Sequence, residues 1–159
     1  MSKHLHSYQV ALTWTGNRGE GTTSYKAYGR EYDITGNTGK VMKGSADPQF
    51  LGDPACWNPE EMLLASLSAC HQLWYLHLCA DAGVRVLRYE DTPRGIMDEL
   101  SGKFTEVTLA PRVVISAGSD AELAVELHHL AHKKCYIANS MNFPVQITCT
   151  DVVVQDAIT

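Results

Sequence analysis

The sequence predicts an α+β fold, in which strands and helices are grouped along the chain instead of alternating strictly. Three observations favour this class. Residues 6–34 have the composition of strands, residues 59–82 have the pattern of one long apolar helix, and residues 84–155 return to strands interrupted by helical segments. Grouped elements of this kind are typical of α+β proteins, whereas a doubly wound sheet requires regular alternation.

The first forty residues predict an antiparallel meander. Residues 6–15 alternate apolar and polar positions, which places one apolar face on a strand. Residues 22–34 are rich in Thr and Tyr, as strands are. Residues 16–19 (GNRG) and 36–39 (GNTG) carry the glycine and asparagine of turns and separate these strands.

A long central helix is predicted after a loop at residues 44–57. Asn58 is a good N-cap, Pro59 suits the first helical position, and Glu61 completes a capping-box pattern. Gly83 is the expected C-cap. Apolar positions at three- and four-residue steps predict a buried stripe, which consists of Leu63, Leu67, Cys70, Trp74 and Leu78. Further apolar residues off this stripe indicate a helix that packs against both a sheet and a partner chain.

The remainder predicts a β-β-α-α-β portion. Residues 84–91 and 103–116 are expected to form two strands joined by a polar connection, and Ser119 is expected to cap a second helix. The helical pattern weakens at residues 132–134, a short helical turn begins at Cys135, and residues 145–155 form a closing strand. A chain of 159 residues is expected to form a single domain over residues 1–159.

The composition excludes several classes of function. The formal net charge is −5, and the 13 basic residues are scattered, so nucleic-acid binding is not expected. No secretory signal and no run of eighteen apolar residues is visible, so we expect neither secretion nor a membrane span. Five cysteines without CxxC spacing indicate reduced thiols in a cytoplasm and not a disulfide framework.

Two cysteines are candidates for chemistry. Cys70 lies on the predicted buried stripe, and Cys135 lies where a short helix is expected to begin. Free amide groups at a helix N-terminus stabilise a thiolate, so we expect a lowered pKa at Cys135, with Lys133 and Lys134 adding positive charge. The other three thiols are interpreted as small inert hydrophobic residues; they are Cys56, Cys79 and Cys149.

Three segments together resemble the OsmC/Ohr family of osmotically inducible and organic hydroperoxide resistance proteins. Residues 58–84 resemble its central helix, in which an Asn-Pro-Glu-Glu start precedes the reactive cysteine, here Cys70. Residues 131–142 resemble the second motif with the resolving cysteine, here Cys135, although the usual proline after it is replaced by Tyr136. Residues 13–22 resemble the opening hairpin of the family.

The resemblance implies an OsmC-like fold that forms an intertwined homodimer, and a thiol peroxidase that needs no cofactor and no metal. Cys70 would attack the O–O bond of an organic hydroperoxide and become a sulfenic acid. Cys135 would condense with it to a disulfide, which a dithiol then reduces.

The family also uses an arginine and a glutamate to polarise the site, and the resemblance assigns these roles to Arg18 and Glu60. Glu61 is the alternative acid. Ten residues of helix separate Glu60 from Cys70 by about 15 Å, so contact requires a neighbouring subunit or another bend. Residues 44–57, where part of the family carries the arginine, contain neither Arg nor Lys.

Other interpretations of these residues remain open. Arg18 could be a solvent-exposed cation at a turn, and the whole chain could be a non-catalytic module that binds a small apolar ligand or senses redox state. A metal site is a further alternative, because three possible ligands have helical spacing: His128, His132 and Cys135. Trp57, Trp74 and Tyr75 could line an apolar pocket or pack in the core. His71 points about 100° away from Cys70 around the helix, which favours a pocket residue over a base.

Overall fold

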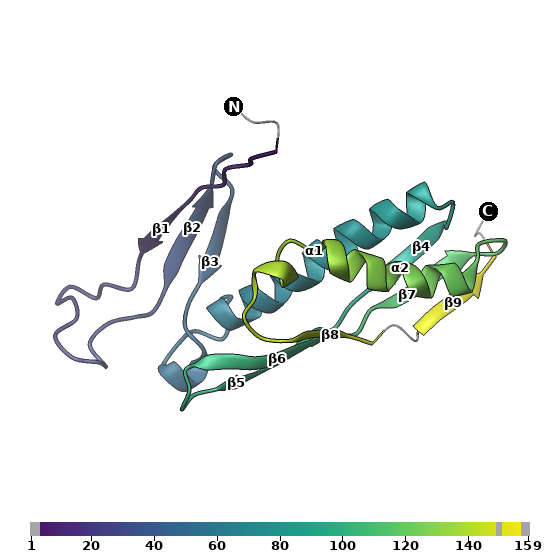
Figure 1. Cartoon of the computed structure of the whole chain (residues 1–159). Helices are drawn as coiled ribbons and strands as arrows, with labels where there is room; N and C mark the ends of the chain where they lie inside the picture. The colour runs from purple at the N-terminus through teal and green to yellow at the C-terminus, as the bar shows by residue number, and fades with distance from the viewer. Residues whose placement is uncertain (1–3, 149–150, 157–159) are drawn as a thin grey trace. The chain divides into compact units, whose positions relative to one another are not determined.

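The computed structural model describes residues 4–148 and 151–156. It has the mixed α+β architecture that the sequence predicts, and it divides into two compact units, residues 1–62 and residues 63–159 (Figure 1). Among the described residues, neither helix has both the length and the apolar character needed to cross a membrane.

The first unit contains an antiparallel three-stranded sheet. Its strands are β1 (Val10–Trp14), β2 (Tyr32–Gly36) and β3 (Val41–Gly44), in the order β1-β2-β3. The strand expected over residues 22–34 was wrong for most of its length, because it begins only at Tyr32. Side chains bind the backbone carbonyls before it: the indole of Trp14 donates to Gly29 O at 2.9 Å, and the Arg30 guanidinium donates to Tyr25 O and Tyr28 O.

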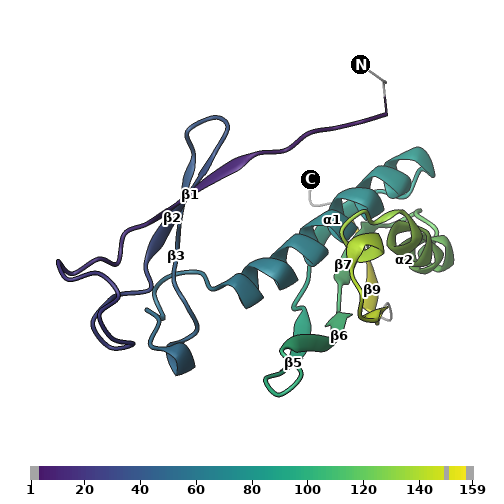
Figure 2. The same ribbon diagram turned by 60° about the vertical axis from the view of Figure 1, so that its left-hand side comes forward.

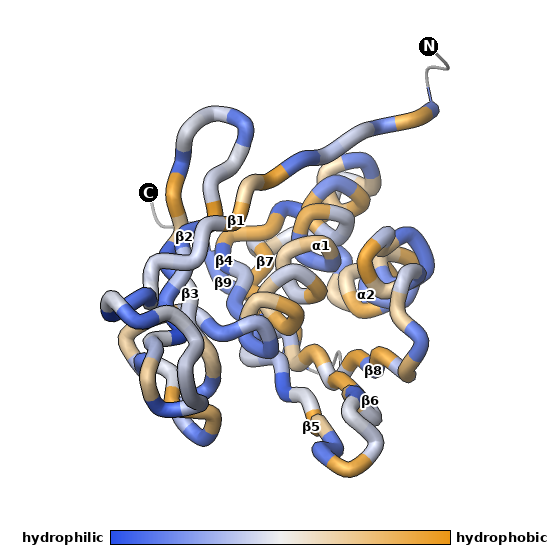
Figure 3. The backbone as a smooth tube through the Cα atoms, turned by 90° about the vertical axis from the view of Figure 1, so that its left-hand side faces the viewer, coloured by the Kyte–Doolittle hydropathy of each residue, from blue (hydrophilic) through white to orange (hydrophobic). Residues whose placement is uncertain are grey.

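This sheet leaves apolar side chains exposed. Tyr8, Val10 and Leu12, which share one face by alternation, are 89%, 66% and 63% exposed. Within the described residues, all of the buried hydrophobic side chains belong to the second unit. Figure 3 shows the hydropathy along the backbone, with apolar and polar positions mixed along β1. The first unit therefore has an apolar surface for which its own residues supply no core.

The long helix α1 (Pro59–Asp81) begins and ends as the sequence predicts. The Asn58 side chain accepts from Glu61 N at 2.7 Å, and the Glu61 carboxylate accepts from Asn58 N at 3.2 Å, which completes the capping box. At the other end, Gly83 has φ +74°, its N–H donates to Ala80 O, and Val84 N donates to Cys79 O. This is a Schellman motif, in which glycine adopts the left-handed conformation without a steric penalty.

The buried stripe of α1 differs from the predicted one. Its buried residues are Leu67, His71, Tyr75 and Cys79, so of the predicted stripe only Leu67 is buried. Cys70 is half-buried, and the adjacent Leu73 is 68% exposed. A helix that is apolar on several sides does not specify by its own pattern which side faces the core, so packing decides it.

The second unit holds two mixed three-stranded sheets, ordered β4-β7-β9 and β5-β6-β8. β4 (Val86–Glu90), β5 (Arg94–Asp98), β6 (Lys103–Leu109) and β7 (Arg112–Ser116) precede the second helix, and β8 (Val145–Ile147) and β9 (Asp151–Gln155) follow it. The antiparallel pairs are β4–β7 and β5–β6, whereas β6–β8 and β7–β9 are parallel.

Three predicted elements of this region were therefore wrong. The polar connection contains β5, and residues 103–116 and 145–155 each form two strands. Residues 103–116 divide at Ala110 and Pro111, where proline lacks an N–H for a sheet and the Asp91 carboxylate accepts from Ala110 N at 2.8 Å. The chain thus leaves one sheet and enters the other.

The second helix, α2 (Ala121–Lys134), packs with α1 on the same side of the β4-β7-β9 sheet (Figures 1 and 2). Asp120, and not Ser119, is its N-cap and accepts from Leu123 N at 3.0 Å. The main core lies between these elements and includes Tyr75, Ile115 and Leu127. A short 3₁₀ turn, Ala138–Ser140, follows α2.

Candidate functional site

The structure brings the side chains of Cys70 and Cys135 together. Cys70 lies in the middle of α1, whereas Cys135 is the C-cap of α2 and is 1% exposed. The Cys70 side chain acts directly on the pKa of Cys135, so the two thiols are neighbours, and both are free cysteines. Packing of the second helix against the first therefore places an accessible thiol next to a buried one, although 65 positions in the numbering separate them.

The electrostatics of Cys135 are opposite to the expectation from the sequence. Burial, with a smaller effect from the neighbouring Cys70 thiol, raises the pKa of Cys135 to about 11. The amide of Ala138 donates to Cys135 Sγ at 3.5 Å and opposes this rise, but does not outweigh burial. The predicted lowering was wrong because Cys135 ends α2, and the turn that follows is only a three-residue 3₁₀ helix. Cys135 is a protonated thiol at neutral pH.

A pocket opens beside the accessible thiol. It has a volume of about 340 Å³ and is lined by Cys70, Leu73, Trp74, His77 and Tyr136. The Trp74 ring contacts the rings of Tyr136 and His77 edge-on, with centroids 5.6 and 5.8 Å apart. A molecule in this pocket would meet mainly apolar and aromatic side chains, one imidazole and one sulfur, which suits a small organic compound.

Sequence reasoning identified only part of this pocket. Of the three aromatic candidates, Trp74 lines it, Tyr75 is fully buried in the core, and Trp57 belongs to the first unit and is exposed. Leu73, His77 and Tyr136 were missed. A signal for this pocket was present in the sequence, because four of its residues have the i, i+3, i+4 and i+7 spacing of one helix face. They are Cys70, Leu73, Trp74 and His77.

A buried histidine pair lies in the core that supports the thiols. His71 Nε2 and His128 Nδ1 are 3.0 Å apart, and the two rings stack with centroids 5.3 Å apart. The Tyr75 ring stacks on His128 at 3.8 Å. His71 is therefore a core residue, and the expectation that it lines the pocket was wrong.

Burial lowers the pKa of His71 to about 4 and that of His128 to about 3, with mutual repulsion adding to the shift of His128. Both rings are neutral at pH 7, so that one N–H donates and the facing nitrogen accepts.

The structure does not bring His128, His132 and Cys135 together as a set of metal ligands. His128 uses its Nδ1 in the hydrogen bond with His71, and residues 4–148 and 151–156 contain no group of three or more His, Cys, Asp or Glu arranged to hold a metal ion.

Arg18 and Glu60 belong to the first unit, whereas both thiols belong to the second. Arg18 is exposed in the loop after β1, where the Asn17 side chain accepts from Gly19 N and Gly21 N. Glu60 lies near Tyr32 and, after burial, contributes to the raised pKa of that phenol. Glu61 is engaged in the capping box, which leaves Glu60 as the available acid of the motif. Their role at the thiols remains a prediction.

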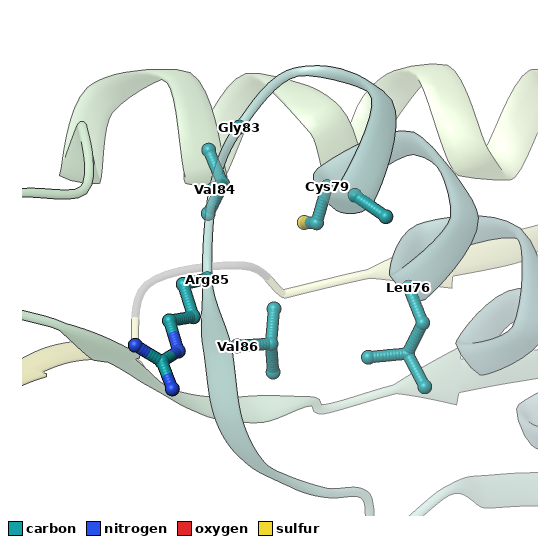
Figure 4. Close-up of a pocket in the computed structure, with 7 residues that line it drawn as sticks. Leu76, Cys79, Gly83, Val84, Arg85 and Val86 are labelled. Atoms are coloured by element: carbon teal, nitrogen blue, oxygen red, sulfur yellow. The ribbon is translucent and has the colours of Figure 1, made fainter. Parts of the chain in front are cut away.

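The other two thiols that the structure describes, Cys79 and Cys56, show no comparable arrangement. Cys79 is 1% exposed, and burial raises its pKa, as expected for an inert core thiol. It lines a second cavity of about 380 Å³ between the end of α1 and the start of β4, shown in Figure 4. Cys56 is half-buried, with its sulfur 4.0 Å from an Asp53 oxygen. Cys149 lies outside the described residues.

Comparison with known proteins gives one sequence family and several similar structures. The sequence model of the OsmC-like proteins matches residues 52–150. A solved OsmC-like protein of unknown function from Vibrio cholerae is 31% identical, with a TM-score of 0.82 over 94% of this chain and 100% of that chain.

Two organic hydroperoxide resistance proteins share the fold at lower identity. The one from Elizabethkingia anophelis is 18% identical, with a TM-score of 0.64 over 98% of this chain and 99% of that one. The one from Bacillus subtilis is 19% identical, with a TM-score of 0.58 over 94% and 98%. No curated protein matches the sequence.

Proposed function

This chain belongs to the family of OsmC-like proteins, and from that premise we propose that it is a thiol-dependent peroxidase that reduces organic hydroperoxides through Cys70 and Cys135. The observation that carries the proposal is the contact between an accessible thiol and a buried thiol beside an apolar pocket. Similar structures whose names refer to organic hydroperoxide resistance support the choice of substrate.

The first step uses the accessible sulfur. The Cys70 thiolate attacks the distal oxygen of R–O–O–H, the O–O bond breaks, and Cys70 becomes a sulfenic acid. The alkoxide R–O⁻ leaves and takes a proton from water to become the alcohol. The apolar pocket holds the R group, so the peroxide oxygen reaches the sulfur at one end of that pocket.

The second step uses the buried sulfur. Cys135 stays protonated because its pKa is raised to about 11, so it is not itself a competing nucleophile toward the peroxide. It condenses with the Cys70 sulfenic acid, an S–S bond forms, and the sulfenic oxygen leaves as water with the thiol proton. An external dithiol then reduces the disulfide and returns both cysteines to thiols.

The remaining roles concern the first unit. We assign to Arg18 the stabilisation of the Cys70 thiolate and to Glu60 the orientation of that arginine, as the family motif implies. A homodimer is the expected assembly, because the apolar face of β1 is exposed and its own unit has no buried apolar core among the described residues. A single domain over residues 1–159 is part of the same proposal.

The test is consumption of cumene hydroperoxide with dithiothreitol as the reductant. We expect catalytic turnover by the wild-type protein and its loss in Cys70→Ser. Cys135→Ser should still react once with the peroxide, and mass spectrometry should then find an oxidised Cys70 in place of the disulfide. Cys56→Ser is the matched control and should keep wild-type turnover. Wild-type consumption no faster than that of Cys70→Ser would reject the function.

One observation favours a second candidate, a redox sensor of low turnover. Tyr136 replaces the proline usual after the second family cysteine, and this residue is 70% exposed at the pocket. A sensor would form the Cys70–Cys135 disulfide with stoichiometric peroxide but would not turn over under excess dithiol. The same assay, run with one equivalent and with excess peroxide, separates the two functions.

A further inference from the structure

The pocket beside Cys70 has a cation at its edge. The Nζ of Lys134 lies 5.3 Å from the centroid of the Trp74 ring, and this ring lines the pocket. An ammonium group over the face of an indole is attracted by the negative π surface, which holds the flexible lysine near the pocket. The pocket thus combines a sulfur, an apolar surface and a positive charge.

Lys134 is the charge that remains available to a ligand. The other basic side chain of the pocket, His77, is paired with Asp81 at 3.4 Å. Across the part of the chain that the structure describes, no carboxylate lies within ion-pair distance of Lys134. The chain as a whole has a net charge of −5, so this cation is not part of a generally basic surface.

A lysine in the last turn of a helix also stabilises the negative end of the helix dipole. Lys133 occupies the same last turn of α2 and serves that purpose equally. No contact between Lys133 and a ring of the pocket is seen in the described residues, whereas Lys134 lies on Trp74. A comparison of Lys133 variants with Lys134 variants therefore distinguishes an effect on the helix from an effect on the pocket.

Building on the peroxidase function proposed above, we infer that Lys134 selects hydroperoxides that carry a carboxylate on a compact apolar body. The body lies against Trp74 and Leu73, the O–O bond reaches Cys70, and the carboxylate meets the Lys134 ammonium. Cys70 and Trp74 lie four residues, about one helical turn, apart on α1, so one substrate can lie along both side chains. The volume of about 340 Å³ suits a molecule built on a single ring.

The test compares three probes of one shape: cumene hydroperoxide, its para-carboxylate derivative, and the methyl ester of that derivative. Dithiothreitol is the reductant throughout. In Lys134→Met we expect kcat/KM for the carboxylate to fall about two- to five-fold, which is the range of one exposed charge pair, with the two neutral probes unchanged. Lys134→Arg should retain the preference, and high salt should reduce it in the wild type.

Lys133→Met is the matched control and should leave all three probes unchanged. An equal loss on all three probes in Lys134→Met would overturn the inference, because it would indicate a role in the shape of the pocket. An equal loss on the carboxylate in Lys133→Met would also overturn it, because general charge would then be the cause. If the wild type consumes all three probes at one rate, only the role of Lys134 is rejected; if it consumes none, the peroxidase function itself is rejected.

Discussion

The buried pair of His71 and His128 makes the unfolding free energy depend on pH. Each folded pKa, about 4 and about 3, lies below the ordinary value of 6.5 that the unfolded chain has. Between these values the unfolded chain binds more protons than the folded one, so acid favours unfolding. The full stability is present above about pH 6.5 and is lost as the pH falls toward 4.

The size of the effect follows from the shifts. From pH 6.5 to pH 5, each imidazole that stays neutral in the folded state lowers the unfolding free energy by about 1.6 kcal/mol, so the pair accounts for about 3 kcal/mol. A domain has only about 5–15 kcal/mol in total, so the change is large. His132 has a pKa that burial also lowers, and it adds to the effect in the same direction.

Urea unfolding, followed by tryptophan fluorescence at pH 7, 6, 5.5 and 5, measures this dependence. Protein concentration is held constant, because assembly would change the apparent stability. In the double variant His71→Phe/His128→Phe, the loss of stability between pH 6.5 and 5 should be smaller by about 3 kcal/mol. His128→Gln, which leaves an amide to bond with His71 Nε2, should remove about half of the dependence.

The exposed His77 provides the control for these variants. Its side chain is 62% exposed and lies outside the buried pair, so His77→Phe should leave the contribution of that pair to the pH dependence in place. The reasoning is refuted if the double variant loses as much stability as the wild type over this range, even where its stability at pH 7 has changed. It is also refuted if His77→Phe removes the dependence as fully as the core variants do.

Two further predictions test local features of the structure. Asn58→Ala should lower the unfolding free energy by about 1 kcal/mol, because it removes the acceptor for Glu61 N at the start of α1; urea unfolding at pH 7 measures it, and no change would contradict the capping box. In the reduced protein at pH 8, iodoacetamide should label Cys135 at least about ten-fold more slowly than Cys70, because Cys135 is buried and its pKa is raised; peptide mass spectrometry gives both rates, and faster labelling of Cys135 would contradict the assignment.

The elements that could be predicted from the sequence are those that depend on neighbours in the chain. The start of α1 is an example, because the Asn58 and Glu61 side chains bond to amides three residues away. Its end is another, because Gly83 adopts a positive φ that other residues avoid. The strand boundary near Pro111 was not predictable in this way, because β6 before it and β7 after it belong to different sheets, and local sequence does not show that change of sheet.

The candidate site was likewise predictable from the sequence only in part. The central motif identified Cys70 and the second motif identified Cys135, but the direction of the pKa shift at Cys135 was wrong. A lowered pKa was inferred from a local helix end, whereas the actual shift comes mainly from burial by residues distant in the chain. The histidine pair and the Lys134–Trp74 contact likewise join α1 to α2, and no spacing within either helix indicates them.

The sequence by itself determined the α+β class, the family, the limits of the long helix and which two cysteines are candidates for the redox pair. The tertiary structure alone decided which side of α1 is buried, that the sulfurs of Cys70 and Cys135 meet, and that Cys135 holds its proton. The physical reason is that caps and turns depend on hydrogen bonds between close neighbours in the chain. Burial, by contrast, depends on all elements that pack around a group, wherever they lie in the sequence.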